Sequence, residues 1–198
     1  QAPVFRYDPK SDSSVWESRI RIASNSYIWI TPDPRGYVWL ATQEGNLVRF
    51  DVLTGTPRYY RLPPGKHMIR CLFVDRDGIV WLGDDNDGVY RFAPADATIL
   101  NIKPVASGRK GLNHPWAFSI TQDLQGNIFV GTMGGGVNVF NLRQKEFHLD
   151  NVSQPIREVN GILLDSRDRL WIGTFDDGLF VFNKNRSLIH HIDEGSDI

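Results

Sequence analysis

The strongest constraint on the fold of this chain is a 19-residue pattern that occurs four times in its 198 residues. Each copy begins with aspartate, continues through a short apolar segment with an aromatic residue, and ends with a second apolar segment. The copies are DPRGYVWLATQEGNLVRFD (33–51), DRDGIVWLGDDNDGVYRFA (75–93), DLQGNIFVGTMGGGVNVFN (123–141) and DSRDRLWIGTFDDGLFVFN (165–183). Their first aspartates lie 42, 48 and 42 residues apart, and a period of this size indicates a repeat architecture.

Each copy opens with a turn, which is followed by a strand with two apolar faces. The sequence Asp-x-x-Gly predicts the turn, because the carboxylate accepts a local backbone N–H and glycine tolerates positive φ. Asp168 replaces the glycine in the last copy and tolerates that conformation better than most residues do. The strands that follow need cover on both faces, which sheets stacked face to face provide. Their tryptophan or phenylalanine is expected to fill the space between sheets, and the alanine or glycine two positions later permits close approach.

Two further strands complete each repeat. An apolar strand precedes the pattern and a more polar strand follows it, as suits an outer edge. Four short strands per repeat of about 42 residues, with almost no helical periodicity, are typical of a β-propeller blade. We therefore predict an all-β fold, a β-propeller of four-stranded antiparallel blades. The repeats are expected at about 27–62, 68–102, 116–150 and 158–192.

The N-terminal residues 4–23 are predicted to form strands of an incomplete blade. Val4–Asp8 resembles the end of a repeat, because Tyr7-Asp8 lies 43 residues before Phe50-Asp51, and the apolar segment Arg19–Ala23 follows a polar linker. The chain would then hold four complete blades and an N-terminal half-blade in one domain, 1–198. A closed ring needs its half-blade completed, so we expect part of a larger propeller of about seven blades. Bare sheet faces and edges would favour self-association.

The bulk composition excludes several classes of protein. With 22 basic and 23 acidic residues, the chain lacks the positive charge that a nucleic-acid partner would require. No apolar run approaches the roughly 18 residues that span a bilayer. Cys71 is the single cysteine, so no disulfide can form within the chain. The start Gln1-Ala-Pro would suit a mature chain whose leader has been removed.

The repeat Asp-x-x-Gly-x-Val/Leu-Trp-Ile/Leu-Gly-Thr-x-x-Gly-Gly-Leu-x-x-Phe-Asp/Asn resembles the two-component regulator propeller repeat, over roughly residues 27 to 192. Ala41 in place of the glycine and Asp84 in place of the threonine depart from it. The resemblance implies the periplasmic sensor region of a bacterial hybrid two-component system histidine kinase. Such a module is non-enzymatic, binds a carbohydrate or oligosaccharide, and signals to a kinase in the remainder of a membrane-anchored sensor. Periplasmic localisation follows from the same resemblance.

Candidate ligand-binding residues lie where turns between second and third strands meet the loops that join blades. In a propeller these segments share one rim, and loops on a rigid scaffold commonly carry binding residues. The spacing of 48 residues places six extra residues in one blade connection, which becomes the first choice for contact. Carboxylates, amides and aromatic rings on one rim suit a sugar. The candidates are His67, Asp85, Asn86, Asp87, Arg109, His114, Trp116, Met133, Arg157, Phe175 and Asp176.

Other kinds of site find less support. The run Asp84 to Asp87 lacks the spaced ligands of an EF-hand loop and fits a turn better than a calcium site. The five histidines match no metal-ligand spacing, and neither a nucleophile elbow nor a phosphate-binding loop occurs, so we expect no cofactor, no metal and no catalytic residues. Arg70 and Asn160 could face the central channel, with contact to channel water as the simpler interpretation. A propeller lyase or hydrolase, and a protein-interaction scaffold, remain alternative functions.

Overall fold

A computed structural model describes residues 5–16, 20–21, 28–105, 111–141, 146–149, 156–193 and 195. All regular secondary structure in this part of the chain is β-strand, and it contains no helix long and apolar enough to cross a membrane. The first repeat forms one antiparallel sheet whose strands are hydrogen-bonded in chain order. They are β3 (Ile28–Asp33), β4 (Tyr37–Thr42), β5 (Asn46–Asp51) and β6 (Pro57–Arg61).

The other three repeats form the same four-stranded sheet. The second contains β7 (Ile69–Val74), β8 (Val80–Asp84), β9 (Val89–Ala93) and β10 (Thr98–Ile102). The third contains β11 (Ala117–Gln122), β12 (Ile128–Thr132), β13 (Gly136–Asn141) and β14 (Glu146–Leu149). The fourth contains β15 (Val159–Leu164), β16 (Leu170–Thr174), β17 (Leu179–Phe182) and β18 (Leu188–Ile192). The prediction of four-stranded antiparallel sheets is confirmed.

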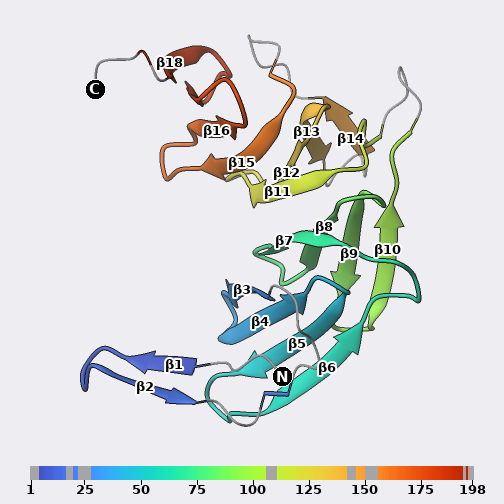
Figure 1. Cartoon of the computed structure of the whole chain (residues 1–198), viewed down its shortest axis with the longest axis vertical. Coiled ribbons are helices and arrows are strands. Elements are labelled where there is room, and N and C mark those ends of the chain that lie inside the picture. The colour runs from blue at the N-terminus through green and yellow to red at the C-terminus, as the bar shows by residue number, and fades with distance from the viewer. Residues whose placement is uncertain are drawn as a thin grey trace.

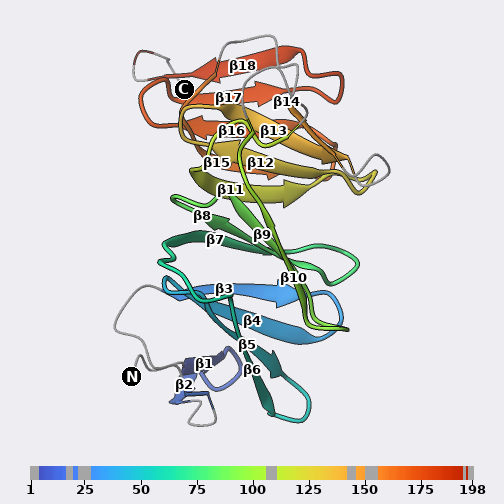
Figure 2. The same cartoon turned by 90° about the vertical axis from the view of Figure 1, so that its right-hand side faces the viewer.

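The four sheets follow one another in chain order along a curve, and each is a blade of a propeller (Figures 1 and 2). Their first strands β3, β7, β11 and β15 lie on the inner side of this curve, and neighbouring first strands contact one another (Figure 1). The last strands β6, β10, β14 and β18 lie on the outer side (Figure 1). The innermost strands therefore lie on the side of the curve where the axis of the propeller runs.

A fifth, two-stranded sheet precedes the first blade. β1 (Phe5–Asp8) pairs with β2 (Ser13–Trp16) as an antiparallel hairpin. That these strands belong to an incomplete blade stays a prediction. β2 begins within the predicted polar linker, after a turn in which Asp8 accepts the backbone N–H of Lys10 at 2.9 Å. Residues 19, 22 and 23 of the predicted segment Arg19–Ala23 lie outside the described residues, so that strand stays a prediction.

The aspartate of each repeat has a role that the sequence pattern did not predict. In three of the four repeats the carboxylate accepts, in addition to a backbone N–H, the indole N–H of the tryptophan six residues later. The three bonds are Trp39 to Asp33 at 3.0 Å, Trp81 to Asp75 at 2.8 Å and Trp171 to Asp165 at 3.1 Å.

The third repeat shows that the aspartate keeps a side-chain donor even where the tryptophan is replaced. Phe129 stands where the other repeats have tryptophan and carries no donor. The side-chain amide of Asn127 donates to Asp123 instead, at 2.7 Å. The repeated Asp and Trp therefore recur together because each satisfies the other inside the blade.

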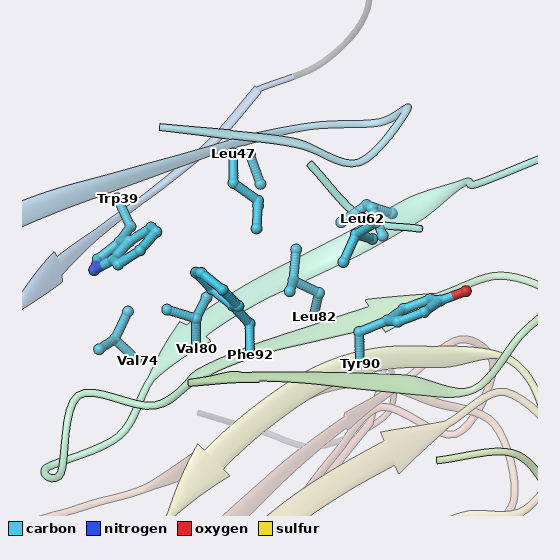
Figure 3. Close-up of a cluster of buried hydrophobic side chains, with 10 residues drawn as sticks. Trp39, Leu47, Leu62, Val74, Val80, Leu82, Tyr90 and Phe92 are labelled. Atoms are coloured by element: carbon cyan, nitrogen blue, oxygen red, sulfur yellow. The ribbon is translucent and has the colours of Figure 1, made fainter. Parts of the chain in front are cut away.

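Apolar side chains fill the space between successive blades. Between the first and second blades, Trp39 and Leu47 of one sheet pack against Leu82, Tyr90 and Phe92 of the next (Figure 3). Two similar clusters lie between the second and third blades and between the third and fourth. The prediction that the repeated aromatic residues are packing residues is confirmed by the first two tryptophans, which are fully buried.

Acid is expected to destabilise the chain through the turns of the first and last repeats. Burial alone would raise the pKa of Asp33, but hydrogen bonds from Arg35 and Trp39 outweigh it and hold the pKa below its ordinary value. The pKa of Asp165 is lowered in the same sense, because hydrogen bonds from Arg169 and Trp171 outweigh its desolvation. A folded-state pKa below the unfolded value stabilises the protein above about pH 4, and this contribution disappears as the pH falls towards the folded-state value.

We therefore expect the free energy of unfolding to decrease below about pH 4, and Asp33→Asn to reduce that dependence. Burial raises the pKa of Asp75, so its protonation favours the folded state at low pH. Asp75→Asn should accordingly make the acid-induced loss steeper. Urea unfolding between about pH 2 and 6 measures how the free energy of unfolding depends on pH in each variant. The same pH dependence in both variants would contradict the opposite pKa shifts of Asp33 and Asp75.

Candidate functional site

Main-chain hydrogen bonds gather the candidate residues on one rim. The backbone N–H of Ile69 donates to the carbonyl of Gln43 in the first blade at 2.9 Å. Gly88 of the second blade donates to Pro115 at 3.0 Å, and Gly134 of the third donates to Arg157 at 2.9 Å. Each turn between second and third strands is thus fixed to the loop that enters the next blade. The predicted convergence of these two kinds of segment is present at every described blade junction.

The innermost strands of three blades each contain a β-bulge at the same position of the repeat. In β7 the pairing skips Arg70, since Ile69 pairs with Asp84 and Cys71 pairs with Gly83. The same irregularity lies between Ala117 and Ser119 in β11, and between Val159 and Gly161 in β15. A bulge leaves one residue unpaired and re-aims its side chain.

The residues on either side of a bulge show where its side chain is directed. Ile69 packs into the core between the first and second blades, and Cys71 into the core between the second and third. Because these neighbours occupy opposite faces, Arg70 lies along the free inner edge of its sheet, towards the propeller axis. Phe118 and Asn160 hold the equivalent positions of the next two blades. We call Arg70, Phe118 and Asn160 the axial residues.

Arg70 is held by the turn of its own blade. Its Nη2 donates to Oδ2 of Asp85 at 2.6 Å and its Nε donates to the same oxygen at 3.2 Å. The sulfur of Met68 lies 3.2 Å from Nη2, and the guanidinium carbon lies 5.5 Å from the centre of the Phe118 ring. The Arg70 side chain is 36% exposed and that of Asp85 is 16% exposed. The pair is therefore ordered by the protein and still accessible from solvent.

The long connection into the third blade is anchored at its C-terminal end. Leu112 is fully buried in the core between the second and third blades. The side-chain amide of Asn113 donates to the carbonyl of Gly135 at 2.6 Å, which holds the loop against the next turn. A Cβ atom at Gly134 would lie 3.1 Å from the His114 ring, so the glycine lets the loop lie flat. Arg109 and Lys110 lie outside the described residues.

This anchoring presents Trp116 at the rim. The His114 ring meets the Trp116 ring edge to face, with centroids 5.5 Å apart. Burial lowers the pKa of His114, so the ring is neutral at physiological pH, and its Nδ1 accepts the backbone N–H of Trp116 at 3.3 Å. Trp116 keeps 42% of its surface exposed, and Phe175 in the turn of the fourth blade keeps 52%. Two large aromatic rings are thus open to a ligand on the same rim.

Three acidic or basic residues near this rim serve the blade itself. Asp84 is fully buried and accepts the backbone N–H groups of Asn86 at 2.8 Å and Asp87 at 3.1 Å. This bonding supports the prediction that the acidic run forms a turn. Nε2 of His67 donates to the carbonyl of Pro63 at 2.7 Å, and its ring packs against the Tyr90 ring and is nearly inaccessible to solvent.

The Asp87 carboxylate bonds to residues of the third and fourth strands of its blade and to Lys103 just after them. Burial would raise its pKa, but hydrogen bonds from Tyr90, Lys103 and Asn101 outweigh it and lower the pKa. The ammonium group of Lys103 lies 2.9 Å from its carboxylate. Asp87 and His67 thus have contacts within the blade, and their roles as ligand contacts stay predictions.

The remaining candidates line the rim, and no side-chain partner is present for them among the described residues. Asn86, Arg157 and Asp176 are exposed, and Met133 is half-buried with its backbone N–H donating to the carbonyl of Trp116 at 3.0 Å. The axial residues Arg70 and Phe118 were not among the predicted ligand contacts. The sequence holds one indication of the direction of Arg70, because this charged residue stands between two apolar residues, Ile69 and Cys71.

The chemistry of this rim suits binding. Exposed aromatic faces, an ordered guanidinium and a carboxylate lie around one axis, as in sites that fix a ligand with few polar groups on an apolar surface. Among the described residues, no group of three or more His, Cys, Asp or Glu side chains could hold a metal ion.

The family model for the two-component regulator propeller matches this chain at residues 64–86 and 153–176. The first match covers β7, the following turn, β8 and the rim turn with Asp85; the second reaches from the blade connection to Asp176. The resemblance predicted from the sequence is therefore confirmed in the second and fourth repeats. Comparison with curated proteins gave no match.

Solved structures with the same fold come from two kinds of protein. One is the extracellular domain of a protein described as a hybrid two-component system of B. thetaiotaomicron, with a TM-score of 0.71 and 20% identity over 87% of this chain. Another is virginiamycin B lyase from Staphylococcus aureus, with a TM-score of 0.75 and 14% identity over 98% of this chain. The extracellular domain of a protein described as a one-component system of B. thetaiotaomicron has a TM-score of 0.65 and 17% identity over 85% of this chain.

These structures are larger than the chain. It spans 25% of each of the two extracellular domains and 64% of the lyase. At these identities the likeness establishes the propeller fold.

Proposed function

We propose that this chain is part of the ligand-sensing propeller of an extracytoplasmic, periplasmic sensor, and that its rim binds an oligosaccharide. The observation that carries the proposal is the set of groups around the axis: the exposed rings of Trp116 and Phe175, the Phe118 ring, and the Arg70–Asp85 pair. A sugar ring offers an apolar face and a rim of hydroxyl groups. Aromatic rings cover the first, and ordered donors and acceptors bind the second.

The sensor role is supported by the repeats. The chain carries two-component regulator propeller repeats, and extracellular domains of a hybrid and a one-component system share its fold. In this proposal residues 1–198 form one partial propeller domain of a ring of about seven blades. The kinase that reads the bound state belongs to the remainder of the membrane-anchored sensor, and the chain itself catalyses no reaction.

The proposal predicts that Trp116→Ala weakens oligosaccharide binding at least about tenfold. Truncation of a central aromatic anchor commonly costs more than about 1.4 kcal/mol, which corresponds to that factor. Calorimetric titration of the full-length polypeptide that carries these blades measures the effect, after a thermal-shift screen has found a bound glycan. Leu124→Ala is the matched control, because Leu124 is exposed in the turn at the opposite end of the blade. Equal losses in both variants would contradict a role of the rim.

A lyase is the second candidate, since virginiamycin B lyase has the same fold over nearly the whole chain. The two functions differ in what happens to the ligand. A sensor returns the glycan unchanged, whereas a lyase converts its substrate. Turnover of an ester or lactone, together with no thermal shift by any glycan, would establish the lyase and reject the sensor. A protein-interaction scaffold would show neither response.

A further inference from the structure

We propose that the Arg70–Asp85 pair selects an uncharged saccharide with neighbouring hydroxyl groups, and discriminates against acidic sugars. This inference rests on the proposed function and adds the class of ligand that the axial site accepts. It concerns the pair because Arg70 is the one charged axial residue among those described, and its ion partner lies in the rim turn of the same blade.

The hydrogen bonds of the pair leave one donor and one acceptor for a ligand. Both bonds from Arg70 end on Oδ2 of Asp85. Within the described part of the chain, Nη1 of Arg70 and Oδ1 of Asp85 have no hydrogen-bond partner, and both side chains reach solvent. A guanidinium edge donates and a carboxylate oxygen accepts. Adjacent hydroxyl groups on one sugar ring fit this arrangement, because one can accept from Arg70 while the next donates to Asp85.

The orientation of the pair also favours a sugar ring. The guanidinium lies over the Phe118 ring, whose centre is 5.5 Å away. Its bulge position sets Arg70 towards the axis, and Met68 and Asp85 fix its outer end. A pre-ordered side chain loses little conformational freedom when a ligand binds.

The charge of the pair opposes an acidic ligand. Asp85 already neutralises Arg70 at 2.6 Å, so a ligand carboxylate would meet a like charge and would have to compete with it. The neighbouring rim residues Arg157 and Glu158 also carry opposite charges. An unpaired arginine, by contrast, binds a carboxylate through two parallel bonds. Removing the charge of Asp85 should therefore change the preference of the site rather than only weaken it.

The test compares matched neutral and acidic probes on the full-length polypeptide. Gluco-, galacto- and manno-oligosaccharides and their C6-oxidised, uronate-containing counterparts are titrated by calorimetry against wild type, Asp85→Asn and Arg70→Gln. We expect wild type to prefer the neutral member at least about tenfold. Asp85→Asn should weaken the neutral ligand about tenfold and strengthen its acidic counterpart. Arg70→Gln should weaken both. Thermal unfolding of each variant establishes that it is folded.

Asp77→Asn is the control for the change of charge, because Asp77 is exposed in the same blade at the other end of β8. It should leave both affinities unchanged. Preference of wild type for the acidic probe would overturn the inference and leave the proposed function standing. The inference would also be overturned if neither Asp85→Asn nor Arg70→Gln changed the affinity for the neutral oligosaccharide. Failure of every probe to bind wild type would reject the proposed function itself, and the inference with it.

Discussion

Gly83→Ala is expected to destabilise the chain by more than about 3 kcal/mol, whereas Gly173→Ala is expected to leave its stability unchanged or slightly higher. The two glycines are the penultimate residues of the second strands, β8 and β16. A Cβ atom at Gly83 would overlap the carbonyl group of Ala117 in the next blade and would lie 2.6 Å from the Cys71 sulfur. The overlap is with backbone, so the two blades would have to separate.

Gly173 is the matched control because the same atom there meets little. Its nearest contact would be the carbonyl oxygen of Gly161 at 3.9 Å. Alanine in a strand also restricts the unfolded chain, which favours the folded state by roughly 0.5–1 kcal/mol relative to glycine. Urea unfolding of the 198-residue chain measures both variants. Similar stabilities for the two would mean that close approach of the blades does not require glycine.

Asp75→Ala should be the second large effect, with a loss of about 2–4 kcal/mol in the free energy of unfolding. The Asp75 carboxylate is 1% exposed and accepts the backbone N–H groups of Asp77 and Ile79 and the indole N–H of Trp81. Trp81 is fully buried, so without Asp75 its N–H would have no acceptor and no access to water.

Asp165→Ala provides the comparison, since Trp171 is only partly buried and water can replace the lost acceptor. We expect a clearly smaller loss in that variant. Thermal or urea unfolding followed by tryptophan fluorescence reports on both sites. A loss at Asp165 as large as that at Asp75 would show that the turn, rather than the buried indole bond, carries the effect.

The fold could be predicted from the sequence because its information is local and repeated. Gly36, Gly78 and Gly126 have positive φ, as the Asp-x-x-Gly turn requires, and Asp168 adopts φ of 59° in place of the fourth glycine. Both alternating apolar faces of the second strands needed cover, and neighbouring blades supply it. Each of these features follows from a few adjacent residues.

The site was harder to predict, because its geometry depends on register and on competing partners. Strand alternation let the sequence direct Arg70 towards the central channel, but a bulge is a property of two paired strands and cannot be read from β7 alone. Asp85 and Asp87 are two positions apart in one acidic run. The first faces the axial arginine, and the second bonds to Tyr90, Asn101 and Lys103 of the outer strands. Composition could not distinguish them.

The axial bulge also bears on how such a blade can diversify. Arg70, Phe118 and Asn160 occupy one position of the repeat and are cationic, aromatic and amide in turn. The residues before them, Ile69, Ala117 and Val159, pack into the cores between blades, whereas the three axial side chains belong to none of these cores. A substitution there changes the chemical group at the axis at little cost to the fold. Duplicated blades can therefore differ in the chemistry of their inner edge while they keep the same packing.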